Sequence, residues 1–252
     1  MNPLSKSELI QKGKYFTPAQ QITVPANGSI SVDFQGYNGR IYGLNRFIIG
    51  GSSLESILAT AKLINTDGKT TIFENIQLNV IQQLFLARSL RGAFIIEPQT
   101  QLELTLTNVT GADIDVNVEL AGYSDVQLNN LKAQYECKGA SFPKPVLVST
   151  KVDVAAGATD SIAKLSLPAS KLRLYRMALR SDSDANIQVK VRYNKYYIKP
   201  LVYLSQINDE FKHMDMILPI DLESTTPFEL YLTNLDGAAL HTVSFLAETY
   251  KV

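Results

Sequence analysis

The sequence contains a single cysteine, two histidines and no tryptophan among its 252 residues. One thiol cannot form an intramolecular disulfide, so Cys137 indicates a protein that folds in a reducing compartment. Nothing around Cys137 matches a catalytic nucleophile, which needs a neighbouring base. His213 and His241 lie far apart and have no acidic residue at the spacing of metal ligands, so we predict structural or surface roles for both.

Excess charge of either sign is also missing, because 24 basic residues balance 24 acidic ones. A protein that coats nucleic acid needs clustered positive charge, so we predict no direct, sequence-specific binding to nucleic acid. The N-terminus lacks the pattern of a secretory signal, and no apolar run approaches the roughly 18 residues of a membrane span. We therefore expect synthesis and folding in the cytoplasm.

Motifs that carry chemistry are scarce: the sequence has no phosphate-binding loop, dinucleotide fingerprint or nucleophile elbow. Residues 50–53 (Gly-Gly-Ser-Ser) lack a following P-loop lysine and are interpreted as a plain loop. Residues 182–186 (Asp-Ser-Asp-Ala-Asn) resemble the start of a calcium loop, but Ile187 and Tyr193 stand where that loop needs Gly and Glu. A solvated loop is favoured there, and a weak interfacial cation is left open. We predict no catalytic, cofactor-binding or metal-binding residue, no cofactor and no enzyme activity.

The strongest signal is an internal repeat. Residues 97–121 align without a gap to residues 223–247 at a shift of 126, half the chain length, and eleven of the 25 aligned positions are identical. Two weaker matches between the halves occur in the same order along the chain: residues 44–47 with 174–177, and residues 24–30 with 154–162. This order indicates duplication of a whole domain and not of one hairpin.

The repeated block predicts a closing β-hairpin in each half. Apolar residues occupy every second position in residues 102–106 and again in residues 114–120, the period of strands with one buried face. Between them lie Asn108 and Gly111, matched by Asn234 and Gly237, residue types that tolerate positive φ in turns. Further β-rich runs between turn signals suggest seven or eight strands per half, which fits antiparallel sandwiches.

Three helices are predicted beside the strands. Apolar residues at helical spacing occur from Ile76 to Phe85 and again from Val202 to Met214, and we interpret both as helices that cover one end of a barrel. A short, mildly basic helix at the N-terminus is predicted from Ser5 as N-cap, Glu8 as its capping-box partner and a stop at Gly13. The proposed organisation is an N-terminal arm over 1–16, domains over 17–128 and 149–252, and a proline-containing linker over 129–148.

A cluster of tyrosines and basic residues lies at positions 192–197 (Arg-Tyr-Asn-Lys-Tyr-Tyr). Such a cluster is compatible with sugar or nucleic-acid binding. A packed subunit interface is favoured, because Tyr and Arg are enriched at interfaces.

The pattern resembles the double jelly-roll major capsid proteins of tailless, membrane-containing bacteriophages, the corticovirus and tectivirus group. The features that carry the resemblance are the closing segments 101–121 and 228–247, each with Leu-Thr-Asn followed by Gly-Ala, the helix before the last strands of each half, and the short N-terminal helix. The resemblance implies an all-β fold of two tandem eight-stranded jelly-roll sandwiches with short accessory helices. It also implies a location in the capsid shell of the virion, after synthesis in the host cytoplasm.

The same resemblance implies particular partners. Homotrimers with a pseudo-hexagonal outline would tile an icosahedral shell, in contact with neighbouring trimers, with penton or minor capsid proteins, and with an internal lipid membrane through the N-terminal helix. Three rival functions are kept: another virion part such as a spike, tail or decoration protein, a carbohydrate-binding sandwich, which the lack of tryptophan disfavours, and a glycan hydrolase. The hydrolase would need a polar cluster in one half that the other half lacks.

Overall fold

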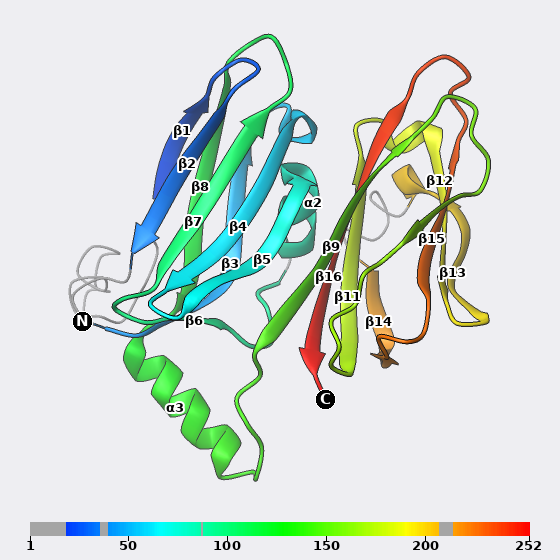
Figure 1. Ribbon diagram of the computed structural model, residues 1–252. Coiled ribbons are helices and arrows are strands. Elements are labelled where there is room, and N and C mark those ends of the chain that lie inside the picture. The colour runs from blue at the N-terminus through cyan, green and yellow to red at the C-terminus, as the bar shows by residue number, and fades with distance from the viewer. Residues whose placement is uncertain (1–18, 36–39, 87, 207–213) are drawn as a thin grey trace, which may run out of the picture.

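The computed structural model describes residues 19–35, 40–86, 88–206 and 214–252. Over these ranges the chain forms two β-sandwiches that stand side by side with their strands in roughly the same direction (Figure 1). The strands of the first are β1 Ala19–Val24, β2 Ser29–Gln35, β3 Tyr42–Gly51, β4 Ile57–Asn65, β5 Gly68–Gln77, β6 Phe94–Ile96, β7 Gln101–Asn108 and β8 Ile114–Tyr123. Those of the second are β9 Pro145–Val154, β10 Ser161–Lys164, β11 Leu172–Ser181, β12 Ile187–Tyr193, β13 Tyr196–Tyr203, β14 Met214–Leu222, β15 Phe228–Asn234 and β16 His241–Lys251.

Each sandwich consists of two four-stranded antiparallel sheets, and the strand orders of the two sandwiches match. Sheet A has the order β1-β8-β3-β6 and sheet B the order β2-β7-β4-β5. Their counterparts are sheet C, β9-β16-β11-β14, and sheet D, β10-β15-β12-β13. Most neighbouring strands are distant in sequence, which is the double Greek-key wrapping of a jelly roll. The predicted fold class of two tandem eight-stranded jelly rolls is confirmed, and the sandwiches are called jelly roll 1 and jelly roll 2 below.

Alternating apolar side chains give each jelly roll its own core. In β7, Leu102, Leu104 and Leu106 are fully buried, and the residues between them are partly exposed. Phe228 and Phe245 pack edge to face in jelly roll 2 with ring centroids 5.7 Å apart. Each such side chain contributes about 1.5–3 kcal/mol on burial, so the period of two in the sequence decides which face of each strand points inward.

The repeated asparagine has the same structural role in both halves. In jelly roll 1 the Asn108 carboxamide donates to the carbonyls of Val24 and Ala112, at 3.2 and 2.7 Å, and accepts from the Thr110 amide at 2.8 Å. Asn234 makes the matching bonds to the carbonyls of Val154 and Ala239 and from the amide of Asp236. Neither asparagine has positive φ, and neither do Gly111 and Gly237. The predicted closing hairpins are wrong, because β7 and β15 lie in sheets B and D whereas β8 and β16 lie in sheets A and C. Each predicted turn is present but crosses from one sheet of its sandwich to the other, and the side chain of the asparagine, not positive φ, holds it.

The ungapped alignment is wrong beyond the turn. The first residue of β8, Ile114, pairs with Val24, and the first residue of β16, His241, pairs with Val154. The shift between β8 and β16 is therefore 127 residues, because the second turn is one residue longer. Leu120 pairs with Phe47 and points into its core, whereas Leu246, its partner in the ungapped alignment, pairs with Ala178 and points outward. Below, residues are called equivalent when these strand registers match them.

The helices differ from their predictions in position. Helix α2 covers Leu78–Phe85, so Ile76 belongs to β5. Within the segment predicted as a helix in the second half, only residues 204–206 are helical among those described, and Val202 and Met214 lie in strands. Residues 207–213 fall outside the described ranges, as does the predicted N-terminal helix. No helix in the described ranges is long and apolar enough to cross a membrane.

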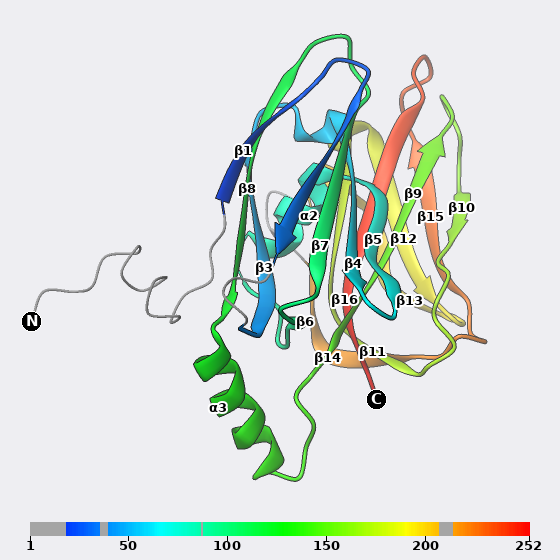
Figure 2. The same cartoon turned by 60° about the vertical axis from the view of Figure 1, so that its left-hand side comes forward.

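An additional helix, α3 over Asp125–Glu136, occupies the segment treated as the start of a linker, and β9 begins at Pro145. The helix extends away from one end of jelly roll 1 (Figure 2). Its capping box, Ser124 with Gln127, is readable in the sequence. The helix has no apolar stripe that would mark it in the sequence, because Leu128 is its one buried residue.

The shared asparagine yields a stability prediction. Asn108→Ala and Asn234→Ala each leave the carbonyl groups that the asparagine bonds in its turn unpaired, so each is expected to lower the free energy of unfolding by about 1–3 kcal/mol in chemical denaturation. Asn129→Ala, on the exposed face of α3, serves as the control and should change it by less than about 0.5 kcal/mol. Equal effects of all three substitutions would contradict the structural role.

Candidate functional site

The candidate functional site is the seam where the two jelly rolls meet. Helix α2 lies in this seam between the two sandwiches (Figure 1), against β3 of its own jelly roll and against β11 and β16 of the other. Almost every residue of α2 is buried. A helix that is covered all round is a core element, so α2 fills the seam and does not cap one end of a barrel as predicted.

The outer face of sheet C is the seat for α2 and β5. Leu147, Ala178 and Leu246 point out of jelly roll 2 and join the apolar core of jelly roll 1. Two backbone amides of jelly roll 1 donate to serines on this face: Glu74 to Ser149 Oγ at 3.4 Å, and Gln77 to Ser244 Oγ at 3.0 Å. Strand β16 is consequently buried on both faces, unlike its equivalent β8.

A buried ion pair lies at one end of the seam. Arg176 in β11 bonds Glu248 directly across in β16, and both side chains are almost inaccessible to solvent. The remaining guanidinium nitrogens donate to the carbonyls of Arg88 and Ser89 at 3.2 Å each. Glu248 accepts in turn from the amide of Arg91 at 3.0 Å. The ion pair of jelly roll 2 thus holds the segment that connects α2 to β6 in jelly roll 1.

Tyr250 extends this polar network. Its hydroxyl donates to Glu248 and accepts from the Gly92 amide at 3.0 Å. Burial, together with the Glu248 carboxylate, raises the pKa of Tyr250 far above its usual value, so the phenol stays neutral and remains a donor. Gly92 itself lies against the chain after α3, where an added Cβ would fall 1.9 Å from the Pro143 carbonyl oxygen.

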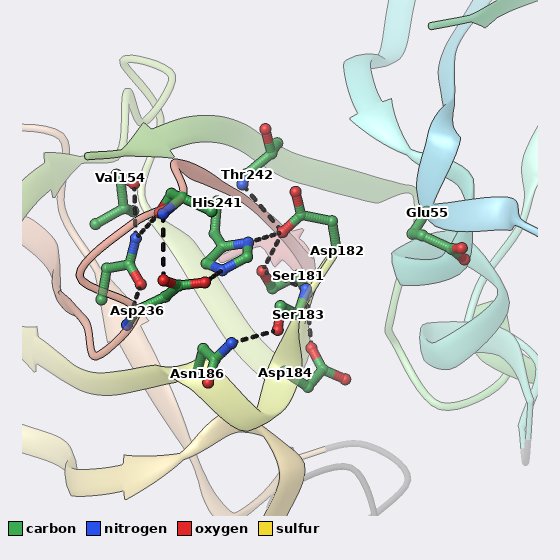
Figure 3. Close-up of polar contacts among 12 residues, drawn as sticks. Glu55, Val154, Ser181, Asp182, Ser183, Asp184, Asn186, Asp236, His241 and Thr242 are labelled. Atoms are coloured by element: carbon green, nitrogen blue, oxygen red, sulfur yellow. Dashed lines mark hydrogen bonds and ion pairs between the residues drawn. The ribbon is translucent and has the colours of Figure 1, made fainter. Parts of the chain in front are cut away.

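His241 is placed between two carboxylates (Figure 3). Its Nδ1 lies 3.0 Å from Asp182 and its Nε2 lies 3.2 Å from Asp236. Asp182 also accepts from the Thr242 amide, while backbone amides and His241 lower the pKa of Asp236. These acidic partners of His241 cannot be recognised from spacing in the sequence, because they come from two separate loops. The group joins those loops, since its polar atoms bond one another and the backbone.

The other singled-out residues also have local structural roles. In the loop at 182–186, Asp184 accepts from the Ser181 amide and pairs with Arg180, so its carboxylate points away from Asp182. Among the described residues no group of three or more His, Cys, Asp and Glu side chains has the arrangement of a metal site. The turn at 50–53 bends through Gly51 and leads into the one-turn helix Leu54–Ser56.

The remaining candidates lie at the surface. Cys137 is exposed at the end of α3. Tyr196 and Tyr197 are exposed on β13, at the flank of jelly roll 2 farthest from the seam (Figure 1). Tyr193 instead packs edge to face on Phe228. His213 lies outside the described ranges.

Sequence reasoning missed the ion pair and the doubly buried strand. A signal for each was present in the sequence. Arg176 belongs to the short segment 174–177 that matches residues 44–47. Residues 243–247 (Val-Ser-Phe-Leu-Ala) lack the charged residues that alternate with apolar ones in residues 115–119. Loss of that alternation indicates burial of both strand faces.

The ion pair gives the second prediction. Glu248→Ala leaves the Arg176 guanidinium buried without its counter-ion, and we expect the free energy of unfolding to fall by about 3–5 kcal/mol in chemical denaturation. Asp221→Ala is the control. It removes the β14 partner of Arg173, which lies on β11 as Arg176 does, but this ion pair is at the surface and its loss should change stability little. Comparable losses from both substitutions would show that burial of the pair is unimportant.

Gly92 gives the third prediction. Gly92→Ala forces a Cβ into the Pro143 carbonyl, so we expect a protein that accumulates as insoluble material or melts at a markedly lower temperature in calorimetry. Gly111→Ala is the matched control, because its added Cβ meets only a side-chain nitrogen at 4.0 Å. Normal stability of the Gly92 variant would mean that the chain after α3 is not held in this position.

No protein-family model matches the chain. No curated protein sequence matches it either. Among solved structures, a chain in the atomic structure of Sulfolobus Turreted Icosahedral Virus aligns over 94% of this chain and 91% of its own length, with 9% identity and a TM-score of 0.52.

Two further structures align with lower scores. The major capsid protein P2 from bacteriophage PM2 aligns over 93% of this chain and 98% of its own, with 9% identity and a TM-score of 0.40. PNGase F, a glycosylasparaginase from Flavobacterium meningosepticum, aligns over 93% and 96%, with 12% identity and a TM-score of 0.31. Strand order and the virus alignment together show that this chain has a double jelly-roll fold, shared over nearly its whole length with a protein of an icosahedral virus.

Proposed function

We propose that the protein is a viral major capsid protein, a structural subunit without catalytic activity. The observation that carries the proposal is the joining of two like jelly rolls through a shared apolar core and a buried ion pair at the seam. An end-to-end alignment with a chain of an icosahedral virus supports it. A shell subunit needs a fixed angle between its two halves, and a filled helix seat with a buried ion pair supplies one.

The proposed assembly is a homotrimer. Three chains contribute six jelly rolls of one topology. If the contacts between chains have the same geometry as the seam within a chain, the six jelly rolls close into a ring with a pseudo-hexagonal outline. Such trimers would tile an icosahedral shell in the virion, together with penton or minor capsid proteins. The mildly basic N-terminal segment would face inward, where it would meet the lipid headgroups of an internal membrane.

The polar cluster around His241 is the feature closest to an enzyme site, since jelly roll 1 has Ile114 at the equivalent position. Its atoms are already engaged: both ring nitrogens contact carboxylates, and both carboxylates also accept backbone amides. Only 12% of the His241 side chain is exposed. This arrangement suits a link between loops and not the binding of a substrate.

The fourth prediction is the state of the purified protein. Sedimentation velocity at micromolar concentration should show a species of three chains, and electron microscopy of concentrated protein should show hexagonal plates or closed particles. A strict monomer at every concentration would overturn the shell function. Protein that stays monomeric alone but binds preformed capsids would indicate a decoration protein instead.

A further inference from the structure

We infer that the outer face of sheet A, around Ile48 and Asn117, is the seat for jelly roll 2 of a second copy of this chain. The inference rests on the proposed function and names the surfaces that meet. The occupant is the flank formed by β13 and the helical turn at 204–206. In the seam, jelly roll 1 presents the corresponding flank, β5 and α2, to sheet C.

The strand registers identify which residues of sheet A match the seat on sheet C. Ile48 pairs with Glu119 as Ala178 pairs with Leu246, and Ala19 pairs with Glu119 as Ser149 pairs with Leu246. The same registers match Asn117 to Ser244. The seat residues on sheet C thus have defined counterparts on sheet A, listed here in order: Ser149 with Ala19, Ala178 with Ile48, Ser244 with Asn117, and Leu246 with Glu119.

On sheet A these positions are uncovered. Ala178, Ser244 and Leu246 are at most 2% exposed under α2, whereas Ile48 is 37% exposed and Asn117 is also open to solvent. A surface depression of about 290 Å³ lies at this place, lined by residues 19–21, 48–50 and 117–119. The depression thus occupies the position on jelly roll 1 where α2 and β5 sit on jelly roll 2.

The flank of jelly roll 2 matches that of jelly roll 1 in register. Gln77 and Tyr203 pair with the equivalent residues Leu58 and Gln188, so β5 and β13 correspond at a shift of 126. Leu204, like Leu78, starts a helical segment and is fully buried. Glu74 therefore corresponds to Pro200.

A matched change on both surfaces supports the pairing. In the seam the Glu74 amide donates to the Ser149 hydroxyl. At the equivalent places Pro200 has no amide hydrogen and Ala19 has no hydroxyl, so donor and acceptor are missing together. Neither surface would bury an unpaired polar group at this contact.

The second seam bond also has a counterpart in this contact. The Gln77 amide donates to Ser244. The corresponding Tyr203 amide donates to Gln206 Oε1 at a long 3.4 Å in the single chain, and in the assembly it would exchange this bond for one to the side-chain carbonyl of Asn117. The exposed side chains of Tyr203, Leu201 and Tyr197 on β13 supply the apolar and aromatic area that a subunit interface uses. β1 and β13 lie on opposite flanks of the chain (Figure 1), so one chain cannot join its own two surfaces and repetition must pass through other copies.

Disulfide trapping tests this contact. In a Cys137→Ser background, Ala19→Cys and Pro200→Cys are combined in one chain, and the purified protein is oxidised mildly. The two sites should be close enough across the interface for a disulfide, whose Cα atoms lie about 4.4–6.8 Å apart. Denaturing gels without reductant should show a ladder that ends at three chains. A mixture of the two single variants should give a band of two linked chains, and a chain with Ala19→Cys and Val109→Cys should give no ladder, because Val109 lies on an exposed end loop.

Point variants give an independent measurement. Ile48→Arg should raise the concentration needed for half-assembly about tenfold or more, and Val109→Arg should leave it unchanged. A native trimer that forms no Ala19–Pro200 link and tolerates Ile48→Arg would overturn this inference while the shell function stands. A protein that stays monomeric at every concentration would overturn both.

Discussion

The structure depends on covering the outer face of sheet C. Strand β16 presents Phe245 to the core of jelly roll 2 and Leu246 to the core of jelly roll 1, so neither face of the strand meets water. Because apolar area on both sides must be buried, jelly roll 2 would expose a large apolar surface without α2 and β5. The two jelly rolls are therefore parts of one folding unit, although each has its own core.

The buried ion pair fixes the geometry of this contact. Hydrophobic burial is not directional, and it would allow α2 to slide along sheet C. Arg176 and Glu248 instead bond particular backbone groups of residues 88–91, and those bonds are lost if the seam shifts by one residue. Removing the pair from water is costly in itself, so its contribution is chiefly to specify one arrangement. A fixed angle between the halves is also what closed assembly requires.

Much of the architecture was predictable from local pattern. Alternation and the duplicated block indicated paired sandwiches, and Asn108 with Asn234 marked true equivalents. Pattern failed where the answer depended on contacts between distant segments. An ungapped match hid one extra turn residue and made Leu246 resemble an inward residue like Leu120, although it faces α2. Likewise, Asp182 and Asp236 reach His241 from separate loops, and no spacing in the sequence encodes that meeting.

Sheets A and C differ in composition as expected if sheet C makes a permanent contact within the chain and sheet A makes the proposed contact with a second copy. The outer face of sheet C is covered by α2 and β5 within the same chain, so it can carry the apolar residues Leu246 and Ala178 without exposing them to water in the folded protein. Sheet A carries Glu119 and Asn117 at related positions, polar residues that keep a newly folded chain soluble. Interfaces that form between folded partners are more polar than the interior of one chain, since each surface must first exist alone in water. The two equivalent faces, one on sheet A and one on sheet C, thus have the composition suited to their separate roles.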